Sequence, residues 1–203
     1  LKVIRGLFLD ELEQELRQAG HDRRRLDALH RRLEGIRFLD PSCGCGNFLV
    51  VTYRELRRLE FEILDRQFPQ DASARQAVNL TLFARVQVDQ AYGIEVEEFP
   101  ARIAEVAMWL MDHQMNMRFS EAFGTYYARL PLTRTAKIVH GDALTTDWEE
   151  VAPNVDYVLG NPPFSGKSNQ TENQKAQLVA IGKSLKIKNA SDLDFVAAWH
   201  MKA

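Results

Sequence analysis

The tetrad Asn161-Pro162-Pro163-Phe164, hereafter the NPPF tetrad, places an amide, a backbone carbonyl and an aromatic ring side by side. An apolar run at 155–159 precedes it and predicts a strand. Two successive prolines cannot donate to a sheet ladder, so the strand must stop there and the backbone stays extended. Ligands of open α/β sheets bind at the carboxyl ends of the strands. The tetrad therefore predicts a binding site, although a proline-terminated strand with Phe164 packed locally fits the same residues.

A glycine-rich turn follows Asp40 within the motif DPSCGCGNF, residues 40–48. Residues 36–39 predict a short strand that ends at Asp40, and residues 47–68 predict a long helix. A glycine-rich turn between a strand and a helix presents unpaired N–H groups to an anion. The pattern matches neither the dinucleotide G-x-G-x-x-G nor a P-loop. Because Asp40 directly precedes the turn, a zwitterionic ligand suits the site better than a pyrophosphate.

Two further acids follow predicted strands. Residues 90–94 predict a strand with Glu95 at its end, and residues 137–140 predict another that is followed by Asp142. An acid that closes the second strand of such a unit typically binds two ribose hydroxyls, and Asp142 could accept a hydrogen bond from an exocyclic amine. Glu95 falls 55 residues after Asp40, instead of the usual distance of about 20 to 30, which predicts an insertion of helices. A solvent-facing Glu95, and an Asp142 that only caps the next turn, are the alternatives.

The remaining periodic segments predict helices at 1–20, 22–33, 74–84, 99–117 and 192–200. Alternating strands and helices predict an α/β fold with a parallel sheet covered on both faces. The methionines of the fourth helix predict core packing; they are Met108, Met111, Met115 and Met117. The arginines of the second helix fit a solvated face, with phosphate contact as the alternative.

The composition of the chain only broadly limits the class of protein. The chain has 203 residues, of which 45% are hydrophobic and 27% charged, enough for one domain or part of a larger protein. Both ends fall inside amphipathic patterns, which predicts a fragment. There is no long apolar run and no signal peptide, so we expect an intracellular protein. The net charge of −2 argues against a whole nucleic-acid-binding protein but not against a catalytic piece of one.

Cys43 and Cys45 are the only cysteines, and they are separated by a single residue. This spacing is awkward for a disulfide, and the five histidines are scattered. We therefore expect reduced cysteines with small side chains that fit the turn, and no metal site.

The segment that follows the NPPF tetrad is polar and basic. Residues 166–188 contain five lysines and a single acid, Glu172. This composition predicts a flexible segment on which a polyanion could lie. An ordinary solvated loop is the alternative.

Taken together, DPSCGCGNF, GIE, GDAL and the NPPF tetrad, each at a strand end and in this order, resemble class I S-adenosylmethionine-dependent methyltransferases. The tetrad narrows the resemblance to amino-directed DNA methyltransferases. The long segment before the glycine-rich turn, and the sequence around the turn, look most like the gamma-class adenine-N6 enzymes of the MmeI-like kind. In those enzymes one polypeptide carries both the modification and the restriction activity. The resemblance implies a Rossmann-like fold, incomplete at its C-terminus, with an N-terminal helical segment at 1–35 and a catalytic core at 36–203.

The resemblance also implies a set of partners. Double-stranded DNA would be the substrate, gripped by a DNA-recognition domain that this chain lacks, and a nuclease domain could belong to the same polypeptide. The protein would act in the prokaryotic cytoplasm, away from membranes.

The family's residue roles carry over by motif. The turn would hold the methionine part of S-adenosylmethionine, through Asp40, Pro41, Ser42, Cys43, Gly44, Gly46, Asn47 and Phe48. Glu95, beside Val96, would bind the ribose hydroxyls, and Asp142, beside Ala143, would bind the adenine. Asn161, which also borders the cofactor, and the Pro162 carbonyl would each accept a hydrogen from the target amine. Pro163 stiffens the backbone, and Phe164 would stack on a flipped-out base.

Methyltransferases with other acceptors carry the same tetrad. Methyltransferases that act on the glutamine amide of release factors, or on guanine N2 in RNA, also carry NPP followed by an aromatic residue. A cytosine-N4 enzyme would more usually have serine in place of Asn161. A non-catalytic module that binds cofactor or scaffolds a larger assembly is the alternative from another class.

Overall fold

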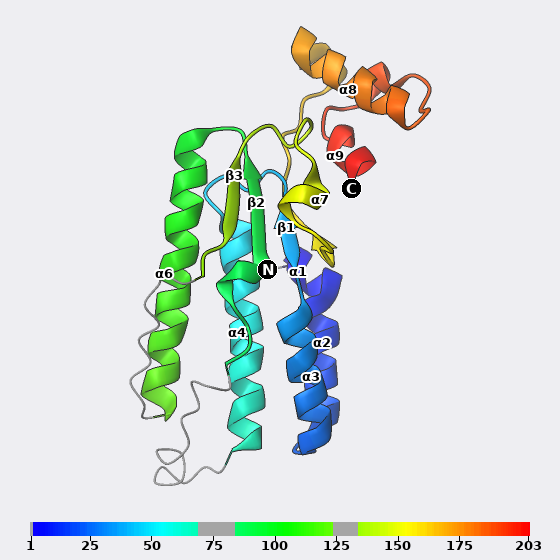
Figure 1. Cartoon of the computed structure of the whole chain (residues 1–203). Coiled ribbons are helices and arrows are strands. Elements are labelled where there is room, and N and C mark those ends of the chain that lie inside the picture. Colours follow the sequence, from blue (N-terminus) through cyan, green and yellow to red (C-terminus); the bar gives the residue numbers. More distant parts are fainter. Residues whose placement is uncertain (1, 69–83, 124–133) are drawn as a thin grey trace.

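A parallel four-stranded sheet forms the centre of the molecule, with strand order β3-β2-β1-β4 (Figure 1). The computed structural model describes residues 2–68, 84–123 and 134–203. The strands are β1 (Phe38–Asp40), β2 (Ala91–Glu95), β3 (Lys137–His140) and β4 (Tyr157–Val158). β4 is shorter than the predicted run at 155–159, but Leu159 N still donates to Leu39 O at 2.9 Å. The expected α/β fold with a parallel sheet is confirmed.

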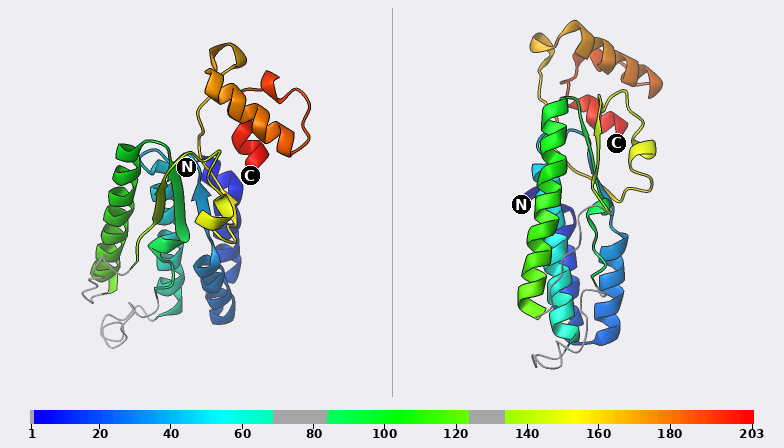
Figure 2. Two further views of the ribbon diagram at one scale, coloured as in Figure 1. Left: turned by 45° about the horizontal axis from the view of Figure 1, so that its top comes forward. Right: turned by 60° about the vertical axis from the view of Figure 1, so that its left-hand side comes forward.

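Helices cover both faces of the sheet (Figure 2). Phe38 packs into a core cluster with α4 (Asn47–Gln67) and α6 (Glu98–Phe123), whereas its neighbour Leu39 packs into a second cluster on the opposite face. The second cluster is built from α7 (Trp148–Val151), α8 (Glu172–Ser184) and α9 (Ala197–Lys202). Successive strand residues point to opposite faces, so one short buried strand supplies both cores.

The N-terminal helices share the first core cluster with α4. They are α1 (Lys2–Ile4), the π-helical stretch η1 (Arg5–Leu9), α2 (Asp10–Ala19) and α3 (Arg23–Gly35). The Asp22 side chain caps α3 by accepting from Arg24 N and Arg25 N. The arginines of α3 that were expected on a solvated face are exposed or half-buried.

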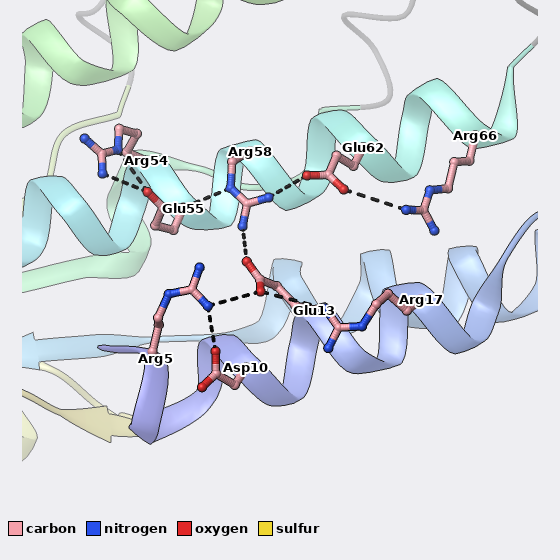
Figure 3. A network of polar contacts seen from close by, with 9 residues as sticks. All are labelled: Arg5, Asp10, Glu13, Arg17, Arg54, Glu55, Arg58, Glu62 and Arg66. Atoms are coloured by element: carbon pink, nitrogen blue, oxygen red, sulfur yellow. Dashed lines mark hydrogen bonds and ion pairs between the residues drawn. The ribbon is translucent and has the colours of Figure 1, made fainter. Parts of the chain in front are cut away.

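A network of ion pairs links α2 to α4 (Figure 3). Arg58 of α4 pairs with Glu55 and Glu62 on its own helix and with Glu13 of α2. Glu13 also pairs with Arg5 at 3.4 Å and Arg17 at 4.0 Å. Exposed ion pairs contribute little individually. Because Glu13 is shared between helices, we interpret the network chiefly as fixing how α2 lies on α4.

Three predictions about helices need correction or fall outside the described residues. Met108 and Met115 are buried, but Met117 is 39% exposed, because α6 has only one face on the core. The final helix begins at Ala197, not at 192, since residues 190–192 form the 3-10 turn η5 (Ala190–Asp192). Residues 74–83 of the helix expected at 74–84 lie outside the described residues, and Ala84 is not helical.

Two short 3-10 helices complete the described elements, η3 (Val88–Gln90) before β2 and η4 (Lys167–Asn169) after the NPPF tetrad. Among the described residues, every helix is too short or too polar to cross a membrane. The division at residue 35 between a helical segment and a catalytic core stays a prediction.

Candidate active site

A cavity of about 470 Å³ opens at the carboxyl ends of the four strands. Each strand end contributes at least one polar residue to its wall, namely Ser42, Glu95, Asp142 and Asn161. The sequence-predicted residues that line the cavity are Pro41, Ser42, Glu95, Val96, Asp142, Ala143, Asn161 and Pro163. The volume suits a ligand of nucleoside size. Four motifs spread over the sequence thus meet at one edge of the sheet, where α/β proteins bind their ligands.

The glycine-rich turn needs glycine at two positions. Gly44 has a φ of 54° and Gly46 a φ of 83°, which L side chains rarely adopt. At Gly46 a Cβ would also lie 3.1 Å from Ala104 Cβ of α6. The turn therefore brings the start of α4 close to α6, and the N-terminus of α4 points toward the strand ends.

Glu95 fastens this turn to the end of β2. Its Oε2 accepts a hydrogen bond from Gly44 N at 2.8 Å, and its Oε1 accepts one from Glu97 N at 3.0 Å. Glu95 is half-buried and lines the cavity, which argues against the solvent-facing alternative. A carboxylate has about four acceptor sites, so it retains capacity for a ligand's hydroxyl groups.

Asp40 lies behind the cavity wall and is only 1% exposed. Burial raises the pKa of its carboxyl from 3.8 to about 7; the charge of Glu95 adds to the rise, while the hydrogen bond from Ser42 N opposes it. Ser42 itself lines the cavity, and its buried Oγ has no hydrogen-bond partner among the described residues. An unpartnered hydroxyl therefore lies beside the cavity at the glycine-rich turn.

Asp142 performs the turn-capping role that was one of its two predicted functions. Its Oδ1 accepts from Leu144 N at 2.9 Å. Its Oδ2 accepts from the side-chain nitrogen of Gln177 at 2.5 Å. The carboxylate is thus held in place on the cavity wall.

The NPPF tetrad leaves β4 at this edge. Asn161 and Pro163 line the cavity, whereas Pro162 lines a neighbouring cavity beside Val158. Phe164 is 72% exposed, so the alternative that it packs locally is wrong. The next residue is anchored, because Ser165 N donates to Asp194 Oδ1 at 3.2 Å and Ser165 O accepts from Phe195 N at 3.0 Å. An exposed aromatic ring therefore projects from a fixed backbone.

Other residues of the turn lie away from the cavity. Cys43 is buried, and its burial raises the pKa of the thiol to about 12, so it stays protonated. Cys45 is exposed, and both cysteines are free. Asn47 is exposed at the start of α4, and Phe48 is half-buried against the first core cluster.

Sequence reasoning missed part of the cavity wall. Helix α8 supplies Asn173, Gln174 and Gln177, helix α9 supplies Trp199, and Phe195 lies just before α9. The prediction of a flexible segment after the tetrad is wrong, because residues 172–184 form α8. The signal was present in the sequence: Thr171 and Gln174 form a capping box, the pattern that starts a helix. Two of the lysines are paired in the structure, Lys167 with Asp192 and Lys175 with Glu172.

A parallel sheet with a glycine-rich turn after its first strand, and a cavity at the carboxyl ends of its strands, defines a Rossmann-like α/β domain. A family model described as "MmeI, DNA-methyltransferase domain" matches residues 16–203. The chain belongs to this family of DNA methyltransferase domains. The resemblance inferred from the motifs is thereby confirmed.

Relatives of known identity agree with this assignment. DNA methyltransferase A of Bacillus subtilis (strain 168) is 37% identical over 205 residues, which cover 98% of this chain and 22% of that protein. The type IIL restriction-modification enzyme MmeI, solved in complex with DNA, superimposes with a TM-score of 0.90 at 49% identity, over 99% of this chain and 26% of that one. A putative type II restriction enzyme and methyltransferase of Methanocaldococcus jannaschii is 26% identical over 102 residues, which are 50% of this chain and 8% of that protein. The chain thus spans about a quarter of the length of its first relatives.

Proposed function

We propose that this domain binds S-adenosylmethionine in the cavity at the strand ends and transfers its methyl group to adenine N6 in DNA. The observation that carries the proposal is that Asn161 lines the same cavity as Glu95 and Asp142. The amide that would hold the acceptor and the acids that would hold the donor therefore share one space. The family assignment supports DNA as the substrate.

The cavity wall suits each part of this methyl donor. Ser42 lines the cavity at the glycine-rich turn, where the methionine part would bind, and its Oγ has no partner among the described residues. Glu95 has capacity for the two ribose hydroxyls, and Asp142 for an exocyclic amine. Ile94 and Phe195 supply apolar surface for a base.

Transfer requires an activated acceptor and little else from the protein. When bound, S-adenosylmethionine supplies an electrophilic methyl group on a sulfonium. The lone pair of an adenine amine is delocalised into the ring, so the amine is a poor nucleophile. If Asn161 Oδ1 and Pro162 O each accept one N–H, the nitrogen moves toward tetrahedral geometry and its lone pair can face the methyl group.

No general base is needed before attack, because the methylated nitrogen becomes acidic and then loses its proton. The main contributions of the protein are positioning and preorganised electrostatics.

The target base must leave the duplex at a cost of a few kcal/mol. Phe164 is placed to offset part of this, because its ring is exposed beside the acceptor-binding residues. Stacking on an aromatic ring contributes about 1 to 3 kcal/mol per base. In the complete polypeptide we propose a DNA-recognition region that selects the site and restriction activity that accompanies methylation.

The test uses the polypeptide encoded by the complete gene, with the 203-residue chain alongside. Each is incubated with methyl-labelled S-adenosylmethionine and unmodified DNA, and the DNA is digested to nucleosides that are identified by mass. We expect the label in N6-methyladenine with the complete polypeptide. DNA without label, or label only in a nucleoside other than N6-methyladenine, would overturn the proposed acceptor.

The matched variant is Asn161→Ala. We expect it to lose transfer while retaining affinity for S-adenosylhomocysteine in calorimetry, since Asn161 acts on the acceptor. Retained turnover would contradict its role in holding the amine.

A further inference from the structure

Helix α8 forms one wall of the cavity and is firmly built. Thr171 Oγ1 accepts from Gln174 N at 3.2 Å, and Gln174 Oε1 accepts from Thr171 N at 2.9 Å, which fixes the start of the helix. Leu178 and Ile181 pack into the second core cluster. Because the apolar side of α8 packs into this core, the polar side of the helix lies against the cavity in a fixed position.

Gln177 occupies the part of this polar side that faces Asp142. Its side-chain nitrogen donates to Asp142 Oδ2 at 2.5 Å across 35 residues of sequence. A carboxylate only accepts hydrogen bonds, so the nitrogen of the amide must face Asp142. This contact uses one of the two amide hydrogens and leaves the second hydrogen and the amide oxygen.

That remaining pair has a particular chemistry. An amide with one donor and one acceptor side by side matches the edge of adenine, where an amine hydrogen and a ring nitrogen lie together. Hypoxanthine carries a carbonyl where adenine carries the amine, so it presents the wrong partner to both Gln177 Oε1 and Asp142.

We propose that Gln177 is a specificity-determining residue of the methyl-donor site, which reads the adenine edge of the donor together with Asp142. This inference rests on the proposed function, because it assigns the base of S-adenosylmethionine to the part of the cavity beside Asp142. Gln177 acts by direct contact with the base and by holding the Asp142 carboxylate in position. Helix α8 is therefore part of the donor site and not only a connection that follows the NPPF tetrad.

The test compares two ligands by isothermal titration calorimetry, which needs no turnover. S-adenosylhomocysteine carries adenine, and S-inosylhomocysteine differs from it in carrying hypoxanthine. For Gln177→Ala we expect roughly 10-fold weaker binding of the adenosyl ligand, as loss of one hydrogen-bonded contact implies. Binding of the inosyl ligand should change much less, so the discrimination between the two ligands falls.

Two further variants make the comparison specific. Gln177→Met keeps the length of the side chain without its polar groups, and it serves if Gln177→Ala does not fold as judged by circular dichroism. Gln114→Ala, on the exposed side of α6, is the matched control and should leave both affinities unchanged.

The outcomes separate this inference from the proposed function. If the unaltered chain binds S-adenosylhomocysteine and the folded Gln177 variant retains full affinity and discrimination, Gln177 has no role in reading the base, and the proposed function stands. If neither the unaltered chain nor the complete polypeptide binds S-adenosylhomocysteine, the proposed donor site falls and this inference falls with it.

Discussion

Asp40 and Gly160 lie against each other at the ends of two neighbouring strands. A Cβ placed on Gly160 would be 2.5 Å from Asp40 Oδ1 and 3.2 Å from its Cγ. The strands β1 and β4 pair in parallel, which brings the residue before the glycine-rich turn next to the residue before the NPPF tetrad. The glycine-rich turn and the NPPF tetrad are thus coupled through a contact at which any side chain larger than glycine would clash.

This contact predicts that Gly160→Ala destabilises the domain by about 1 to 3 kcal/mol, the usual penalty of overpacking. Asp40 is buried and has little room to move aside. Urea unfolding measures the free energy. Gly166→Ala is the control, because a Cβ there would lie 3.9 Å from its nearest contact, Asp194 Oδ2. Equal unfolding free energies for the two variants would show that the site relaxes freely.

Asp40 should make stability depend on pH. Burial is the main cause that raises its pKa from 3.8 to about 7 in the folded state. Between these values the folded state binds more protons than the unfolded state, so the free energy of unfolding falls as pH rises from about 4 to about 7 and then levels. From pH 5 to pH 8 the loss from this group is about 3 kcal/mol.

The check on this prediction is Asp40→Asn, which cannot titrate. Urea unfolding at several pH values should show the variant gaining stability relative to the unaltered chain as pH rises. Parallel curves for the two proteins would mean that Asp40 titrates normally in the fold.

Glu95→Gln should weaken binding of S-adenosylhomocysteine about 10- to 100-fold, since hydrogen bonds to a charged acceptor contribute about 1.5 to 3 kcal/mol. The variant loses acceptor capacity for ribose and also weakens the bond from Gly44 N. Calorimetry measures the affinity. Glu97→Gln is the neighbouring control, as Glu97 is exposed. Similar affinities in both variants would remove Glu95 from the ribose site.

Phe164→Ala should leave stability unchanged and slow methylation by the complete polypeptide. The ring is 72% exposed, so the fold loses little, but the flipped base loses a stacking partner. We expect the activation free energy of methylation, measured from the single-turnover rate, to rise by about 1 to 3 kcal/mol. Phe195→Ala is the contrasting variant, because Phe195 is 5% exposed and its loss should lower the thermal midpoint. An unaltered methylation rate for Phe164→Ala would rule out stacking as its role.

The sequence by itself determined where the strands end and which motifs follow them. Apolar runs closed by glycine, proline or an acid are local signals, and they placed Asp40, Glu95, Asp142 and the NPPF tetrad at one edge of a parallel sheet. Strand ends of a parallel sheet must share an edge, so proximity of these residues followed from their order. The same reasoning failed for Met117, because periodicity alone does not reveal which face of a long helix meets the core.

Only the tertiary structure decided which side chains bond across the cavity. Glu95 meets Gly44 N across 51 residues, and Gln177 meets Asp142 across 35. A hydrogen bond between distant elements leaves no mark on local composition, because it forms only after strand pairing and core packing have fixed both partners. For this reason the sequence predicts a flexible basic segment at 166–188, whereas the fold contains α8, which forms one wall of the cavity at the strand ends.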